Sequence, residues 1–211
     1  MGGTITAIRI QKKNPRRASL YLDGRFALGL AVEVVQDWGL HRGQVLDEAE
    51  LEALRRAEGQ HRALRDALRL LNQRLRSTAE VRERLLRRGY DEEQVEGVLS
   101  RLTELGLLDD RAFARAWVEN RQVFRPRGRP ALAAELRKKG LSPEIIAEVL
   151  EASPPEDEAA LALARRRAPA LRGLERPTFL RRLHAFLARR GFSPEVVRRV
   201  ASQVWEEQEV E

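Results

Sequence analysis

Four arginines lie close together around a segment rich in proline and glycine near the middle of the chain. These are Arg121, Arg125, Arg127 and Arg129, followed a short way on by Lys138 and Lys139. No acidic residue lies between Glu119 and Glu135. A guanidinium offers a planar fork of donors that can bind a phosphate or a carboxylate through two hydrogen bonds, and Phe124 could stack beside them. The segment therefore indicates an anion-binding site. The alternative is a solvated loop in which basic residues only complement helix ends.

The remaining polar residues give little support for catalysis. The chain has no cysteine, which excludes disulfides, thiolate nucleophiles and cysteine-based zinc sites. The three histidines, His41, His61 and His184, are far apart in sequence. Asp109-Asp110 stands at the start of a predicted helix, and capping that helix and complementing its positive end accounts for both acids. Phosphate-loop and nucleophile-elbow motifs are absent. We therefore expect a protein that is not an enzyme and needs no cofactor or metal.

The composition favours a helical binding protein. Of the 211 residues, 43% are hydrophobic, 34% are charged and 5% are aromatic, and the net charge is +7. High charge with few aromatics suits thin helical units that each bury one stripe and solvate the rest. The basic excess favours polyanions or acidic proteins as partners. The sequence shows neither a membrane-spanning apolar run nor a signal peptide, so we expect a cytoplasmic protein.

A repeat of 51 residues organises the second part of the chain. Gly89, Gly140 and Gly191 share this spacing, and each follows two basic residues and precedes a bulky apolar residue and a helix-capping residue. A glycine ends a helix at low steric cost by taking positive φ, and the capping residue starts the next helix. The pattern predicts three three-helix units. Their helices are expected at 61–76, 78–88 and 92–105, at 110–124, 129–139 and 143–151, and at 157–168, 177–190 and 194–208.

Residues 1–60 are predicted to form a small α/β cap. Ser19–Leu22 and Arg25–Leu28 flank Asp23-Gly24, a pair that suits a tight hairpin turn, and Asn14-Pro15 is expected to break the chain before it. A short helix should end at Gly39, and a capping box at residues 47–50 should open another helix through about residue 58. We therefore predict a mainly α protein: a tandem array of three three-helix units at 61–108, 109–155 and 156–211, after a cap at 1–60 that contains a β-hairpin.

Several segments of the chain resemble the RecX family. The resemblance is carried by Gly106-Leu-Leu-Asp-Asp-Arg-Ala-Phe-Ala114, by Val118-Glu-Asn-Arg121 and by the segment from Gly128 to Leu141. It covers residues 61–200 well, and Tyr21-Leu-Asp-Gly-Arg-Phe26 is similar to the extension of longer members. Pro130 departs from the family pattern, in which a β-branched aliphatic residue is expected after the Gly-Arg pair.

The resemblance implies a regulator of the RecA recombinase that acts in homologous recombination, DNA repair and the SOS response. Such a protein binds the RecA–single-stranded DNA filament and dampens its ATPase, strand exchange and assembly. The candidate filament-binding residues are Arg121, Arg125, Arg127, Arg129, Lys138 and Lys139. Partners would be the filament and single-stranded DNA, directly or through the filament, with no membrane, and a monomer is expected. The alternative is a general nucleic-acid-binding helical module, whose binding would fall steeply with salt and need no recombinase.

Overall fold

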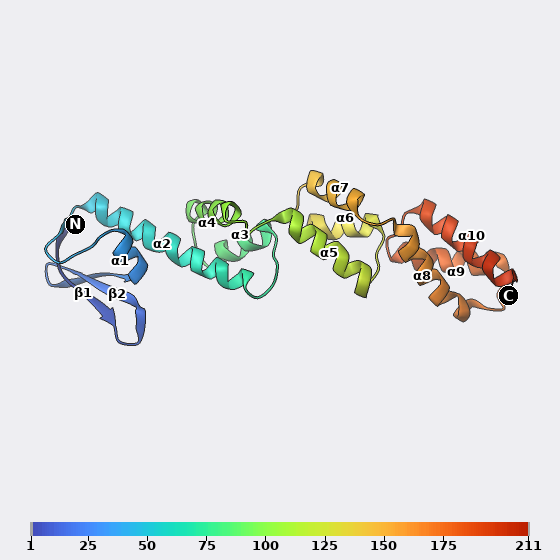
Figure 1. The fold of residues 1–211 in the computed structure, drawn as a ribbon, viewed down its shortest axis with the longest axis horizontal. Coiled ribbons are helices and arrows are strands. Elements are labelled where there is room, and N and C mark those ends of the chain that lie inside the picture. Colours follow the sequence, from blue (N-terminus) through green and yellow to red (C-terminus); the bar gives the residue numbers. More distant parts are fainter. Residues whose placement is uncertain (1, 211) are drawn as a thin grey trace. The chain divides into compact units, whose positions relative to one another are not determined.

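The computed structural model describes residues 2–210, and its contacts divide the chain into two compact units. The first unit holds the residues up to 75 together with 81–108, and the second holds 76–80 together with 109–211. Figure 1 shows a small sheet at the N-terminal end followed by helices, as predicted. The fold class, mainly α with three three-helix units in tandem and a small N-terminal sheet, is confirmed.

A four-stranded antiparallel sheet of order β3-β2-β1-β4 forms the start of the first unit. Its strands are β1 (Gly3–Gln11), β2 (Asn14–Leu22), β3 (Arg25–Ala31) and β4 (Val45–Leu46). The predicted hairpin turn is present, with φ of 47° at Asp23 and 80° at Gly24. The predicted break at Asn14-Pro15 is wrong, because β2 begins at Asn14 and the preceding turn lies at residues 12 and 13. Helix α1 (Val32–Asp37) follows β3 and ends before Gly39, as expected.

The next helix, α2 (Glu48–Leu71), is one continuous helix where the sequence predicted two. The capping box is present, since the side chains of Asp47 and Glu50 each accept a hydrogen bond from the other's backbone N–H. Buried positions continue with helical spacing on both sides of Gly59, so nothing ends the helix there. The first half of α2 packs on the sheet through Leu51 and Leu54, and its second half enters the core of the first repeat.

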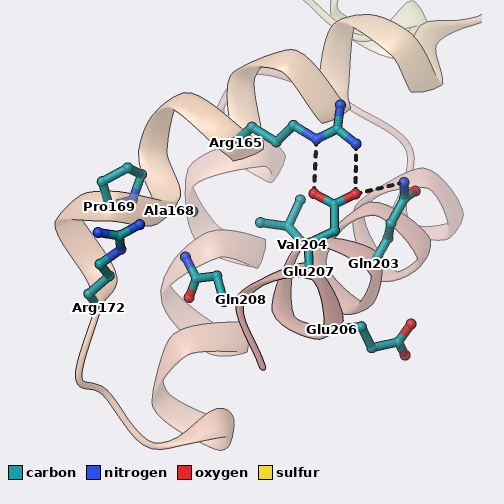
Figure 2. Close-up of a pocket in the computed structure, with 9 residues that line it drawn as sticks. All are labelled: Arg165, Ala168, Pro169, Arg172, Gln203, Val204, Glu206, Glu207 and Gln208. Atoms are coloured by element: carbon teal, nitrogen blue, oxygen red, sulfur yellow. Dashed lines mark hydrogen bonds and ion pairs between the residues drawn. The ribbon is translucent and has the colours of Figure 1, made fainter. Parts of the chain in front are cut away.

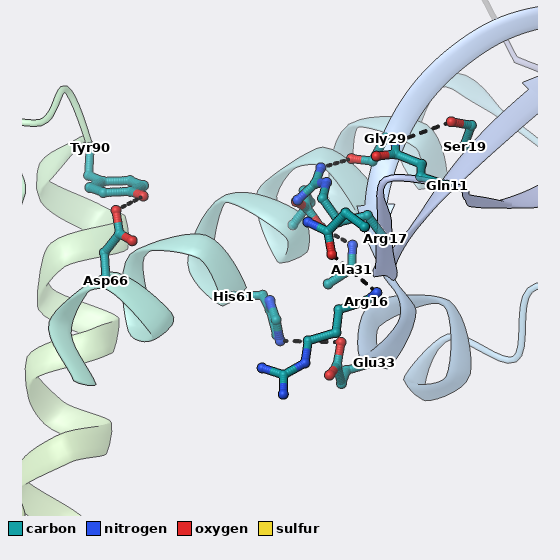
Figure 3. Close-up of polar contacts among 12 residues, drawn as sticks. Gln11, Arg16, Arg17, Ser19, Gly29, Ala31, Glu33, His61, Asp66 and Tyr90 are labelled. Carbon is teal, nitrogen blue, oxygen red and sulfur yellow. Dashed lines mark hydrogen bonds and ion pairs between the residues drawn. The ribbon is translucent and has the colours of Figure 1, made fainter. Parts of the chain in front are cut away.

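A buried carboxylate ties α2 to the sheet. Glu58 is 7% exposed, and its Oε1 accepts a hydrogen bond from Nη1 of Arg17 at 2.8 Å. Its Oε2 accepts from the backbone N–H of Ala31 at 2.7 Å, and Nη2 of Arg17 donates to the carbonyl of Gly29 at 2.8 Å. Figure 3 shows Arg17 reaching across the strands to this point. Every member of the network is satisfied, which is the condition for tolerating a buried charge.

Three repeats of helix, helix, glycine turn and helix make up the rest of the chain. The first repeat consists of the end of α2, α3 (Thr78–Leu86) and α4 (Glu92–Glu104). The second consists of α5 (Asp110–Phe124), α6 (Arg129–Lys138) and α7 (Pro143–Ala152). The third consists of α8 (Glu156–Arg167), α9 (Arg176–Arg189) and α10 (Pro194–Val210). A short 3-10 helix, η1 (Ala168–Leu171), follows α8. The repeat glycines have φ of 86°, 78° and 78°, so the predicted turns are confirmed. Each repeat encloses its own apolar core.

The glycine turn is also a joint within the second unit. A Cβ added to Gly140 would lie 2.3 Å from the Cβ of Ala79, and one added to Gly191 would lie 2.2 Å from the Cβ of Ala131. The carbonyl that precedes each glycine accepts a hydrogen bond at the same place, from Oγ of Ser77 at 2.6 Å and from the backbone N–H of Gly128 at 3.1 Å. These two glycines therefore provide close backbone approach as well as positive φ.

Candidate binding site in the second repeat

The basic segment lies where α5 ends and α6 begins. Asp109 caps α5 by accepting hydrogen bonds from the N–H groups of Arg111 and Ala112 at 2.8 and 3.0 Å. Asp110 lies in the first turn of α5, where its charge complements the positive end of the helix, as predicted. Its side chain does not cap α5, because its Oδ1 accepts a hydrogen bond from the N–H of Thr78 at 2.8 Å. The second acid thus binds the start of α3 to the second repeat. Pro130 lies in the first turn of α6, where a proline fits without loss of a helical hydrogen bond.

Trp117 and Glu135 form the centre of the site. Oε2 of Glu135 accepts hydrogen bonds from Nε1 of Trp117 at 2.9 Å and from Nε of Arg121 at 2.8 Å. The guanidinium carbon of Arg121 lies 4.4 Å from the centroid of the Trp117 ring, and Nζ of Lys139 lies 5.0 Å from it. The side chains from α5, from α6 and from the glycine turn thus hold one another in place through hydrogen bonds and cation–π contacts.

The charge of Glu135 is well supported by its surroundings. Partial burial on its own raises the pKa of this carboxyl group. Hydrogen bonds from Arg121 and Trp117, and the charges of Arg121 and Arg127, act in the opposite direction and outweigh it, so the pKa lies below its ordinary value. The carboxylate consequently stays ionised and neutralises part of the basic segment near neutral pH.

Four of the six predicted binding residues have partners inside the protein. Arg121 contacts Glu135, and Nε of Arg127 lies 3.9 Å from Oε1 of the same carboxylate. Nη2 of Arg129 donates to the carbonyl of Ser153 at 3.1 Å. Nζ of Lys139 lies 2.7 Å from a carboxylate oxygen of Glu80. These side chains therefore contribute to the architecture of the second unit as well as to its charge.

The other two predicted residues face solvent. Arg125 and Lys138 are exposed, and within the described residues neither makes an ion pair or a side-chain hydrogen bond. Next to Arg125, at the end of α5, Val123 and Phe124 are 72% and 74% exposed. The predicted stacking of Phe124 with the arginines is not observed. The second repeat thus carries two available cations, Arg125 beside the exposed apolar pair at the end of α5 and Lys138 at the end of α6.

The sequence prediction missed Trp117 and Glu135 as members of the site. A signal was present, because Trp117 and Arg121 have the i, i+4 spacing of neighbours on one helix face. Glu135 is also the one acidic residue in the basic segment from 120 to 141. A lone acid among so many cations indicates an internal ion pair.

A hollow of about 850 Å³ lies in the third repeat, against η1 and α10. Figure 2 shows Arg165 and Glu207 bridging it with two hydrogen bonds, of 2.9 and 2.7 Å. These hydrogen bonds lower the pKa of Glu207, so the ion pair persists at neutral pH. The described residues that line this hollow include no serine, threonine or histidine. Among residues 2–210 no group of His, Asp and Glu side chains could hold a metal ion, and no helix is long and apolar enough to cross a membrane.

Comparison with known proteins identifies the family. Family models match at residues 3–47, described as the N-terminal domain of regulatory protein RecX, and at 63–102, 109–150 and 155–201, described as the first, second and third three-helix domains of RecX. Regulatory protein RecX of Thermobifida fusca is 40% identical over 152 residues, which are 71% of this chain and 82% of that protein. This chain belongs to the RecX family.

Other RecX proteins agree with this assignment. RecX of Streptomyces coelicolor is 43% identical over 143 residues, 67% of this chain and 76% of that protein. A crystal structure of regulatory protein RecX matches this chain with a TM-score of 0.80 and 27% sequence identity. The match covers 96% of this chain and 100% of the chain in that crystal structure. Membership of the RecX family implies a regulator of RecA, and the relatives' names describe regulators rather than enzymes. All six predicted binding residues lie in the second three-helix domain.

Proposed function

We propose that this chain binds the RecA–single-stranded DNA filament through its second repeat and thereby lowers ATP hydrolysis, strand exchange and filament assembly. The observation that carries the proposal is the exposure of two cations of the second repeat, Arg125 beside the exposed Phe124 and Lys138 at the end of α6. The filament offers DNA phosphates and acidic protein side chains, and both are partners for exposed cations. An exposed aromatic ring adds apolar area to such a contact.

The six predicted residues divide into two roles in this proposal. Arg125 and Lys138 contact the filament, because intramolecular ion pairs do not occupy them. Arg121, Arg127 and Lys139 hold the frame around Glu135 and Glu80 that fixes the positions of those contacts. Arg129 fixes the start of α6 through Ser153. We expect the protein to act as a monomer, which size-exclusion chromatography with light scattering would check.

The test is sedimentation with preformed RecA–single-stranded DNA–ATP filaments, beside naked single-stranded DNA at about 150 mM salt. We expect recovery with the filament and little with naked DNA, together with a fall in filament ATPase activity. Equal recovery with both, lost together as salt rises, would instead identify a general nucleic-acid-binding module. Unchanged ATPase despite binding would contradict the proposed direction of the effect.

A matched pair of variants locates the contact. Arg125→Glu with Lys138→Glu reverses two exposed charges in the second repeat, and Arg166→Glu with Arg198→Glu reverses two exposed charges in the third. Both double variants change the net charge equally, and none of the four side chains has an ion-pair partner among the described residues. We expect the first to lose most of its filament binding and the second to retain it. Equal losses would show that only net charge matters.

A further inference from the structure

One face of the N-terminal sheet is not used by the proposed function. Along β2, Ala18, Leu20 and Leu22 are buried in the core of the first unit, so Ser19 and Tyr21 lie on the opposite face. Strand pairing places Phe26 opposite Tyr21, and Arg9 opposite Ser19. Directly opposed residues of neighbouring strands share a face, so both lie on this outer side.

The outer face presents an aromatic pair with a cation on it. The ring centroids of Tyr21 and Phe26 are 6.0 Å apart with an interplanar angle of 79°. The guanidinium carbon of Arg9 lies 5.2 Å from the centroid of Tyr21. Phe26 is 61% exposed, so its ring gains little from the folding of its own domain. Its aromatic surface is therefore available for a ligand.

The strands also carry most of the net charge. Residues 1–31 contain six basic residues and one acidic residue, which gives +5 of the whole chain's +7. The acidic residue, Asp23, accepts a hydrogen bond from the N–H of Thr4 at 3.0 Å. The exposed cations that have no ion pair among the described residues include Arg9, Lys12, Lys13 and Arg25. The two lysines lie in the turn at the far end of β1 and β2, whereas Arg25 pairs with the buried Leu22 and so belongs to the other side of the sheet.

We propose that this sheet face binds single-stranded nucleic acid. A base stacks on Phe26, and the phosphates that follow contact Arg9 and the two lysines of the turn, Lys12 and Lys13. Aromatic rings for stacking, combined with cations that follow the backbone, are the two components of sequence-tolerant single-strand binding. The site lies outside the second repeat and requires no recombinase.

The proposed contact between the sheet face and DNA is small, so the salt concentration determines whether binding can be measured. If three phosphates are contacted, a rise in salt from about 50 to about 150 mM lowers the affinity about 10-fold. Binding to naked DNA should therefore be clear at about 50 mM salt and weak near 150 mM salt. The face can thus hold a strand without abolishing the expected preference for the filament.

The experiment is a fluorescence anisotropy titration of the full chain with a labelled dT20 oligonucleotide in about 50 mM salt, without recombinase. Phe26→Ala should weaken binding about 5- to 150-fold, which is the range for loss of one stacked base. Val45→Ala removes another exposed apolar side chain of the same sheet and should leave binding unchanged. Lys12→Ala with Lys13→Ala should make the negative slope of log affinity against log salt shallower by about 1.4.

Photocrosslinking of the same oligonucleotide to the unaltered chain gives a second, independent readout. The proposal expects crosslinks on the peptide that contains Tyr21 and Phe26. Wild-type affinity in Phe26→Ala, crosslinks confined to 121–139, or equal binding of double-stranded DNA would each overturn it. None of these results would contradict the filament proposal. That proposal would fail if the double variant Arg125→Glu with Lys138→Glu still sedimented with the filament.

Discussion

Replacing Gly191 by alanine tests whether the repeat glycine joins neighbouring repeats or only turns the chain. The substitution has two costs. The first is the left-handed backbone, φ 78°, which destabilises a residue with a Cβ by about 1–2 kcal/mol. The second is the new Cβ itself, which would lie 2.2 Å from the Cβ of Ala131 and 3.2 Å from its Cα. Relief of such overpacking typically costs about 1–3 kcal/mol. The free energy of unfolding should therefore fall by about 2–5 kcal/mol.

Gly173 provides the matched control in the same repeat. Its φ is 77°, and an added Cβ would meet nothing within 4 Å, so Gly173→Ala carries the backbone cost alone. Gly89 is the control at the equivalent repeat position, with φ 86° and again nothing within 4 Å. In urea unfolding followed by circular dichroism, Gly191→Ala should cost about 1–3 kcal/mol more than Gly173→Ala. Equal costs would refute the joint.

A second substitution at the joint separates the clash from other effects. Ala131→Gly removes the methyl group that the new Cβ would meet, and by itself costs no more than about 1 kcal/mol in a helix. Added to Gly191→Ala, it should recover most of the clash energy, which would give a favourable coupling in a double-mutant cycle. Additive effects of the two substitutions would show that the glycine does not act through Ala131.

Three further measurements follow from the contacts described above. Glu58→Ala leaves the Arg17 guanidinium and the N–H of Ala31 without their carboxylate, and should lower the free energy of unfolding by about 3–5 kcal/mol in urea titrations; a loss below about 1 kcal/mol would contradict the buried network. Phe124→Ala should change that free energy by less than about 0.5 kcal/mol, because the side chain is 74% exposed, yet weaken sedimentation with the filament. Since the pKa of Glu135 is lowered from 4.5 by folding, its stabilisation is complete above that pH and is lost as the pH falls through the lower folded value. Melting temperatures from pH 7 to 3 should therefore show Glu135→Gln less stable than the unaltered chain near neutrality and closer to it at pH 3; a constant difference would argue against the ionised pair.

Local chemistry explains why much of the fold could be predicted. Positive φ at Gly89, Gly140 and Gly191, the capping residues after them and the Asp23-Gly24 turn are all properties of a few neighbouring residues. The continuity of α2 was missed because a glycine in a helix costs only about 1 kcal/mol, which packing on both sides of Gly59 outweighs. The type of a residue does not show how much stability its neighbours gain by packing on elements that are distant in sequence.

The same reasoning explains why the candidate site was predicted only in outline. The cluster of cations is visible in the sequence, but whether each cation is available depends on partners from other elements. Lys139 is 59 residues from Glu80, and Arg121 is 14 residues from Glu135. Asp110 was assigned only to its own helix, and the sequence did not show that its carboxylate also accepts a hydrogen bond from the N–H of Thr78. Charge counts therefore overestimate how many cations a ligand can use.

Lys139 illustrates what this means for mutagenesis of the basic segment. Its ammonium group contacts Glu80 and the ring of Trp117, and its carbonyl accepts the hydrogen bond of Ser77 beside the Gly140 joint. Reversal of its charge would place two carboxylates together and loosen the segment at residues 76–80. A loss of filament binding in that variant would then report on the architecture of the second unit as much as on the interface. Arg125 and Lys138 lack such contacts among the described residues, so substitutions at these two positions test the proposed interface directly.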